Sequence, residues 1–213
     1  DFMSGVSYFI NKAISEKKYK DRKDFDFEEP LTRLIQIATV LCISTSYGMS
    51  YLLVGDLPDT SLWWKLASII ACGTMAAFLI PEFTKVFTSS HSKHVQEIVT
   101  ASREGGASLT ILSGLVAGYF SAFYKGILIA GLMFVAYLIS GMGLQNVMPH
   151  ASVFAFGLVA YGFLCMGPGN IAVDSYGPVT DNAQSIFELA QTEAIPGIDK
   201  EIAKAAKDDK LVE

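Results

Sequence analysis

The chain has 213 residues, of which 51% are hydrophobic and only 17% are charged, and its formal net charge is −5. Soluble domains usually carry about a quarter charged residues, so this composition indicates a membrane protein. The slightly acidic balance, with no basic stripe interleaved with aromatic residues, argues against nucleic acid as a partner. The sequence begins Asp1-Phe2-Met3 without a visible signal peptide, and we expect it to be an internal fragment of a longer protein.

Long apolar runs divide the chain, and they predict an all-α, multi-pass membrane protein built as a bundle of transmembrane helices. A helix needs about 20 apolar residues to cross a bilayer core of about 30 Å. The four predicted spans, with their cytoplasmic extensions, are residues 31–54, 62–86, 107–144 and 151–188. Residues 1–30 are expected to hold the end of a preceding helix and a basic loop, and residues 191–213 a cytoplasmic loop with a short helix starting near Asp199.

The third apolar run is too long for one span, because a single helix over it would measure about 55 Å. Lys125 interrupts the run and is interpreted as an interfacial anchor. We therefore place the membrane-crossing part at Gly126–Ile139 with its flanks. Residues 107–124 are then a helical extension outside the membrane or a buried segment, in which Gly114 and Gly118 would let another helix approach closely.

The positions of lysine and arginine predict the orientation of the spans. Nearly all of them lie in the N-terminal segment, in the segment at 88–103 and in the C-terminal tail, whereas the loops at 55–61 and 141–150 contain none. Because cytoplasmic loops carry the excess of positive charge, both ends of the chain are predicted to be cytoplasmic. Trp63-Trp64-Lys65 opens the second span as an interfacial group, with the lysine expected to reach outward to water.

An acidic stretch follows the fourth apolar run. Asp174 and Asp181 are seven residues apart, which places them on one helical face about 10 Å apart along the axis, and Glu188 continues the same stripe. Carboxylates beside an amide, here Asn182, are hard oxygen ligands that suit Mg²⁺ or Ca²⁺. An ordinary solvated helix end, where acidic residues are common, is an equally good interpretation of the spacing.

Two other groups of polar residues are candidate sites. Glu82 lies at the end of the second apolar run, where a charge inside hydrocarbon would cost about 2.5–3.5 kcal/mol. A functional acid and an acid already in the headgroup region are both compatible with this position. His91, His94 and Glu97 have a helical spacing that suits a metal, but their polar surroundings favour a solvated loop.

The remaining motifs point to structure. Cys42, Cys72 and Cys165 all lie inside apolar runs and are interpreted as small core residues, neither disulfides nor metal ligands. Gly167-Pro168-Gly169 predicts a kink or a close helix contact inside the fourth run, with functional unwinding of the helix as a further alternative. No P-loop sequence and no nucleophilic Ser/His/Asp arrangement is visible, so a P-loop ATPase is not supported.

Three stretches together resemble the membrane-bound, ion-pumping inorganic pyrophosphatases. They are Ile171–Ser185, with the specific run Pro-Val-Thr-Asp-Asn; Val99–Gly118; and Ile80–Ser89, which looks like the family's glutamate-bearing helix end. The order of these stretches and the spans between them also match, so the resemblance covers essentially the whole chain.

The resemblance implies a fold of about sixteen transmembrane helices that works as a homodimer in a membrane, the inner membrane in a bacterium. Such pumps hydrolyse pyrophosphate with Mg²⁺ at the cytoplasmic side and move H⁺ or Na⁺ outward. The resemblance implies that Asp181 binds metal and, with Asn182, substrate, and that Asp174 is a further catalytic and metal-binding carboxylate. It makes Glu82 the coupling acid. The sequence leaves open which ion is moved and whether K⁺ activates.

The other acidic and lysine motifs of the family's active site are absent from these residues. We therefore expect the chain alone to be catalytically incomplete and to depend on the remaining segments of the same pump. Two alternatives come from other classes. One is a secondary transporter that uses Glu82 and Asp174 as coupling-ion carboxylates without hydrolysis, and the other is a structural membrane subunit whose acidic residues are merely solvated.

Overall fold

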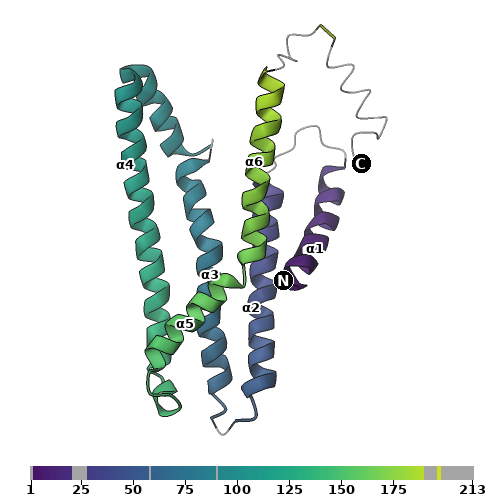
Figure 1. The fold of residues 1–213 in the computed structure, drawn as a ribbon, viewed down its shortest axis with the longest axis vertical. Helices are drawn as coiled ribbons and strands as arrows, with labels where there is room; N and C mark the ends of the chain where they lie inside the picture. Colours follow the sequence, from purple (N-terminus) through teal and green to yellow (C-terminus); the bar gives the residue numbers. More distant parts are fainter. Residues whose placement is uncertain (1, 21–27, 58, 90, 190–195, 198–213) are drawn as a thin grey trace. The chain divides into compact units, whose positions relative to one another are not determined.

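Helices form all the regular elements in the described part of the computed structural model (Figure 1). Residues 2–20, 28–57, 59–89, 91–189 and 196–197 are described. The elements in chain order are α1 (Phe2–Tyr19), α2 (Glu28–Val54), α3 (Leu62–Thr88), α4 (Lys93–Ser140), the short 3-10 helix η1 (Leu144–Asn146), α5 (Ala151–Leu164) and α6 (Gly167–Leu189). The predicted all-α class is confirmed. The helix expected near Asp199 lies outside the described residues.

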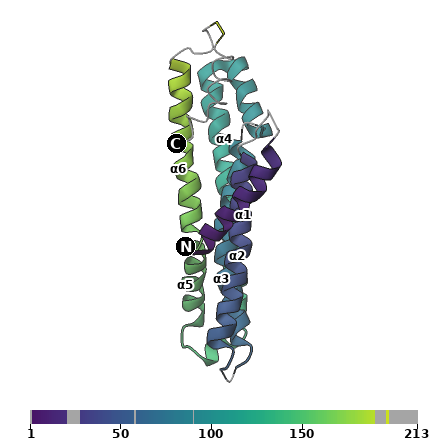
Figure 2. The ribbon, with the colours of Figure 1, turned by 90° about the vertical axis from the view of Figure 1, so that its right-hand side faces the viewer.

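The chain forms two compact units, residues 1–170 and residues 171–213. The first unit contains α1 to α5 and the first turn of α6, and the second contains the rest of α6. Within the first unit α3 is central, because α2, α4 and α5 all pack against it, while α1 packs against α2. Figure 2 shows α5 running alongside α3.

A close helix contact joins α3 to α5 through two glycines. A Cβ added to Gly73 would lie 1.9 Å from the carbonyl oxygen of Val159, and one added to Gly162 would lie 2.0 Å from the carbonyl oxygen of Ile70. The Thr74 hydroxyl donates across the same contact to the Gly162 carbonyl at 3.2 Å. Without side chains at these two positions, the backbones approach closely enough for dispersion and hydrogen bonding to hold the helices together in an apolar medium.

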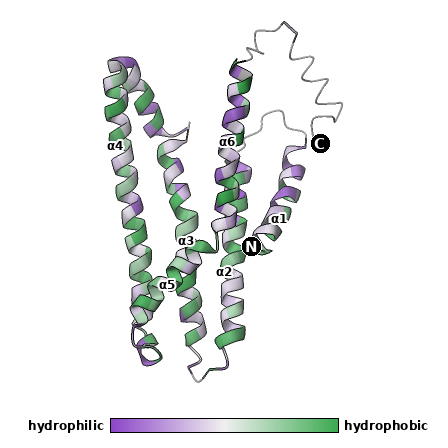
Figure 3. Cartoon of the chain, viewed as in Figure 1, coloured by the Kyte–Doolittle hydropathy of each residue, from purple (hydrophilic) through white to green (hydrophobic). Residues whose placement is uncertain are grey.

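Small and polar side chains make up much of the interior of the first unit, beside large residues such as Ile69 and Leu144, and many large apolar side chains face outward. Among the described residues seven alanines are buried: Ala38, Ala67, Ala76, Ala77, Ala136, Ala151 and Ala155. On α1 the polar Ser7 and Asn11 are buried, and Asn11 donates to the Pro30 carbonyl at 3.0 Å, whereas Phe9 is 69% exposed. Figure 3 shows the apolar colouring over long stretches of α2, α3 and α4. This inverted pattern is typical of helices surrounded by lipid or by further apolar helices.

Two or three candidate membrane spans occur in the described residues, judged by length and composition. α2 qualifies over Glu29–Val54, and α3 and α4 qualify as one apolar run over Leu62–Ser140. α5 and α6 qualify when taken together as one bent span. The chain reverses direction within the run that contains α3 and α4 (Figure 1). The division into four spans remains a prediction.

The turn inside α4 occurs at two glycines. Gly106 has φ 60° and ψ −148°, a conformation that glycine adopts at little cost, and Gly105 is also non-helical. The helix then continues to Ser140, so Lys125 interrupts the apolar run but not the helix. No described atom lies within 4 Å of a Cβ added at Gly114 or Gly118. The close helix approach expected there is therefore not made within this part of the chain.

Lys65 does not reach outward to water as predicted, because its side chain is buried at the start of α3. The residue is 6% exposed, and its Nζ lies 3.8 Å from Asp59 Oδ2 and 3.7 Å from the position of a Cβ at Gly143.

Hydrogen bonds from the Ser61 hydroxyl and amide, with a smaller effect of the Lys65 charge, lower the pKa of Asp59. The ionised carboxylate therefore stabilises the fold above its ordinary pKa, and this contribution is lost as the pH falls through the lowered value.

Candidate functional site

α6 carries the predicted acidic stripe on a helix that continues through Pro178. Asp174 and Asp181 are both exposed, and two helical turns separate them, which keeps them on one face. In the described part of the chain neither carboxylate forms a hydrogen bond or an ion pair. Glu188, two turns further on, accepts a hydrogen bond from Gln184 at 2.8 Å. The two aspartates thus have free carboxylate oxygens for a ligand.

These side chains suit a hard cation such as Mg²⁺ in chemistry but not in number. Asp174 and Asp181 offer carboxylate oxygens and the neighbouring Asn182, also exposed, offers an amide oxygen. Among the described residues, no three His, Cys, Asp or Glu side chains lie close enough together to hold a metal ion. The stripe on α6 supplies at most part of a ligand set.

Glu82 lies near the end of α3 in an ion pair that the sequence analysis did not identify. Lys85 Nζ donates to Glu82 Oε1 at 2.9 Å and also to the hydroxyl of Thr32 on α2. The side chains of Glu82 and Lys85 are 27% and 34% exposed. The acid is therefore half-buried and neutralised by a neighbour that also links α3 to α2. Its i,i+3 spacing from Lys85 was the available signal in the sequence.

A second cluster of charges joins α1 to α2 and was also missed. The Glu29 carboxylate accepts hydrogen bonds from Lys18, Arg33 and the hydroxyl of Tyr19, the last at 2.5 Å. Arg33 is four residues after Glu29, a spacing visible in the sequence, but Lys18 and Tyr19 come from another helix. The cluster fixes the start of α2 against the end of α1.

His94, which was considered above as a possible metal ligand, makes packing contacts in the structure. Its ring stacks on Phe87, with centroids 4.6 Å apart, and Phe87 in turn stacks on Tyr124. The Nδ1 atom of His94 lies 3.7 Å from Glu97 Oε2. This group packs the beginning of α4 against the end of α3 and against the part of α4 that follows the turn at Gly105 and Gly106.

The predicted kink in the fourth apolar run is present as a break between α5 and α6 at residues 165–166, directly before Gly167. The buried Met166 lies at this break, and its Sδ is 4.0 Å from the hydroxyl of Thr39 on α2. Cβ atoms added at Gly167 and Gly169 would meet nothing within 4 Å in the described residues. These glycines therefore accompany a bend and make no close helix contact there.

Residues 2–208 match the family described as Inorganic H⁺ pyrophosphatase. The chain belongs to this family. The curated relatives of the chain have names that describe ion pumps. A "K(+)-insensitive pyrophosphate-energized proton pump" from Chlorobaculum tepidum is 52% identical over 199 residues, which is 93% of this chain and 26% of the relative.

Two more distant relatives differ in the ion that their names specify. A "K(+)-insensitive pyrophosphate-energized proton pump" from Methanosarcina mazei is 28% identical over 90% of this chain and 27% of its own length. A "Putative K(+)-stimulated pyrophosphate-energized sodium pump" from Clostridium tetani is 30% identical over 88% of this chain and 26% of its own length. The chain thus spans about a quarter of the length of these three curated relatives. No solved structure matches it.

Proposed function

We propose that the chain is part of a membrane pump that hydrolyses inorganic pyrophosphate and couples the hydrolysis to ion transport. The observation that carries the proposal is a pair of carboxylates on one face of α6, Asp174 and Asp181, that have no partner among the described residues. They lie in the stretch that resembles the family's signature, in a chain that belongs to that family. The names of the relatives give no support to a secondary transporter without hydrolysis.

In this proposal the residues of α6 bind the metal ion and the pyrophosphate. Asp181, Asn182 and Asp174 would hold Mg²⁺, which when bound neutralises phosphate oxygens and acidifies an attacking water. The helix itself keeps the two carboxylates in register along its axis, and their exposure leaves them open to ligands from other segments. Pyrophosphate is a dense anion, so an acidic wall without cations would repel it.

We further propose H⁺ as the transported ion, because the 52% identical relative is named a K⁺-insensitive proton pump. The complete pump is proposed to work as a homodimer in a cell membrane, the inner membrane in a bacterium, with its hydrolytic site in the cytoplasm. The test is pyrophosphate-dependent acidification of vesicles that contain the complete protein. Hydrolysis without ion uptake, or uptake without added pyrophosphate, would contradict the proposal.

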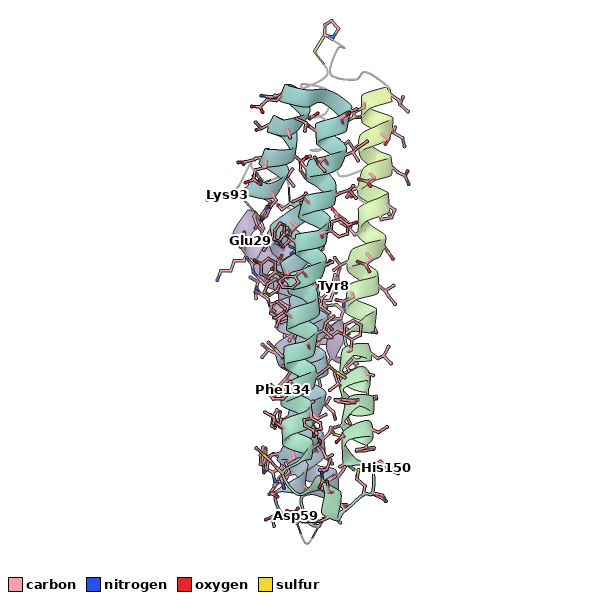
Figure 4. All side chains as sticks on the ribbon, turned by 90° about the vertical axis from the view of Figure 1, so that its left-hand side faces the viewer. Tyr8, Glu29, Asp59, Lys93, Phe134 and His150 are labelled. Atoms are coloured by element: carbon pink, nitrogen blue, oxygen red, sulfur yellow. The ribbon has the colours of Figure 1, made fainter. Side chains whose placement is uncertain are left out.

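The four-span topology is proposed with the basic segments in the cytoplasm. Glu29 and Lys93 lie toward one end of the first unit, and Asp59 and His150 lie toward the opposite end (Figure 4). The starts of α2 and α4, which adjoin two of the cation-rich segments, thus lie opposite the two loops without Lys or Arg. Positively charged loops of membrane proteins are generally retained in the cytoplasm, and this rule supports the orientation.

Single cysteines in a cysteine-free full-length pump are expected to report this topology. A thiol at Asp59, or at its exposed loop neighbour Asp56, should react with an impermeant maleimide added outside the cell. A thiol at Ser92 should react only after the membrane is permeabilised. Asp56 is the better position, because replacing Asp59 would remove its ion pair with Lys65. The reverse labelling pattern would overturn the orientation.

Glu82→Gln is expected to lower the number of ions pumped per pyrophosphate hydrolysed. The change leaves Lys85 as an unbalanced cation between α3 and α2, where an uncompensated charge is costly. The ratio of ion uptake to phosphate release would be measured in reconstituted vesicles. Glu97→Gln, which alters an exposed carboxylate on α4, is the control. If the Glu82→Gln pump assembled normally and the ratio were unchanged, Glu82 would have no role in coupling.

A further inference from the structure

Two cysteines from different helices line one cavity in the first unit. The cavity has a volume of about 750 Å³ and lies among α1, α2, α3 and the end of α5. Cys42 comes from α2, and Cys165 is the residue that caps α5. Both thiols are free and half-buried. The third free cysteine, Cys72 on α3, is buried and does not line this cavity.

An independent contact places the same parts of α2 and α5 together. The hydroxyl of Thr39 lies 4.0 Å from the sulfur of Met166. Thr39 is three residues before Cys42 on α2, and Met166 is the residue after Cys165. The two thiols are therefore on neighbouring turns that are already in contact, and they face a common space.

We propose that Cys42 and Cys165 form a binding site for a soft, two-coordinate divalent cation such as Hg²⁺. Thiolate sulfurs select soft metal ions. Zinc is not expected, because it takes four ligands, and the described residues offer no third His, Cys, Asp or Glu side chain near this pair. The other sulfurs lining the cavity are the thioethers of Met3 and Met49, which are weaker ligands.

The charge balance favours a divalent ion over a monovalent one. Binding converts two thiols into two thiolates, forms two metal–sulfur bonds and releases two protons, so a dithiolate of a divalent ion is neutral. A monovalent ion would leave one negative charge in a cavity whose lining carries no ionisable group apart from the thiols and Tyr161. Because an unpaired charge is costly in apolar surroundings, the neutral complex is preferred.

A bridged pair would clamp the break between α5 and α6, because Cys165 stands at that break and Cys42 lies on a different helix. Asp174 follows Cys165 by nine residues along the chain. Inhibition of the pump by the cation is therefore a secondary consequence of the site, and it depends on the proposed function. Binding of the cation does not depend on it.

The site is tested by native mass spectrometry of the full-length pump titrated with mercuric chloride, in a background where cysteines outside these 213 residues are serine. We expect one Hg²⁺ per subunit with the loss of two protons. Because two linked ligands bind far more tightly than either alone, Cys42→Ser and Cys165→Ser should each weaken binding by about 100-fold or more. Cys72→Ser, the matched control, should leave binding unchanged.

Three results would overturn the site. Undiminished binding in either cavity variant would show that the two thiols do not act together. Loss of binding in Cys72→Ser alone would place the ion elsewhere. Failure of Hg²⁺ to bind the folded pump at all, with binding after denaturation, would show that other segments of the pump fill the cavity. The three variants also separate this inference from the pyrophosphatase proposal, since the mass measurement requires no activity.

Discussion

Asp181→Asn is expected to lower pyrophosphate hydrolysis by the full-length pump by about 100-fold or more. The substitution keeps the size of the side chain and its capacity for hydrogen bonds but removes the charge. Asp181 is exposed on α6 without a partner in the described residues, so no structural ion pair is lost with it. The expected loss is therefore one of ligand binding and not of folding. Phosphate release would be measured while Mg²⁺ is titrated.

Two other substitutions on α6 serve as comparisons. Asp174→Asn, at the other carboxylate proposed to hold Mg²⁺, should also reduce hydrolysis, though less than Asp181→Asn, and it is expected to affect transport as well. Glu188→Gln, two turns beyond Asp181, should be tolerated, because the amide can still accept the hydrogen bond from Gln184. An Asp181→Asn pump with an unchanged rate and unchanged Mg²⁺ dependence would leave the stripe as an ordinary solvated helix end.

Gly73→Ala is expected to destabilise the pump by about 1–3 kcal/mol or to prevent its assembly. The new methyl group would lie 1.9 Å from the Val159 carbonyl oxygen, and that oxygen belongs to the backbone of α5, which cannot move aside as a side chain would. Gly162→Ala should act similarly through the Ile70 carbonyl. The fraction of monodisperse protein after heating in detergent would be compared for each variant.

Gly157→Ala provides the matched control for this contact. Gly157 also lies on α5, but an added Cβ there meets nothing within 4 Å in the described residues. Alanine is favoured over glycine within a helix, so this variant should be as stable as the native protein or slightly more so. Equal stability of Gly73→Ala and Gly157→Ala would show that α3 and α5 do not approach as closely as described.

Local spacing was sufficient to predict the acidic face of α6. Asp174 and Asp181 share a face because the helical period relates residues seven apart, and α6 remains helical through both. The apolar runs likewise predicted α2 and the paired helices α5 and α6 with a bend at Gly167. In each case the signal lies within one helix, where sequence distance and spatial distance are directly related.

The charged contacts could not be predicted in the same way. Lys65 was expected at the membrane surface from its neighbours Trp63 and Trp64, but the loop containing Gly143 covers it. That loop is nearly eighty residues further along the chain. The position of Glu82 was recognised, whereas its link to Thr32 through Lys85 required knowing that α2 packs against α3.

Composition and helical period are local properties, so they were sufficient to predict the membrane class, the helical content and the face that carries Asp174 and Asp181. Which small residues mediate helix contact depends on how the helices pack, and this could not be read from the spacing of the glycines. Gly114 and Gly118 have the spacing of a contact motif, yet Gly73 and Gly162, 89 residues apart, form the close approach. A glycine pattern permits an approach, but the packing of α3 against α5 selects where two backbones meet.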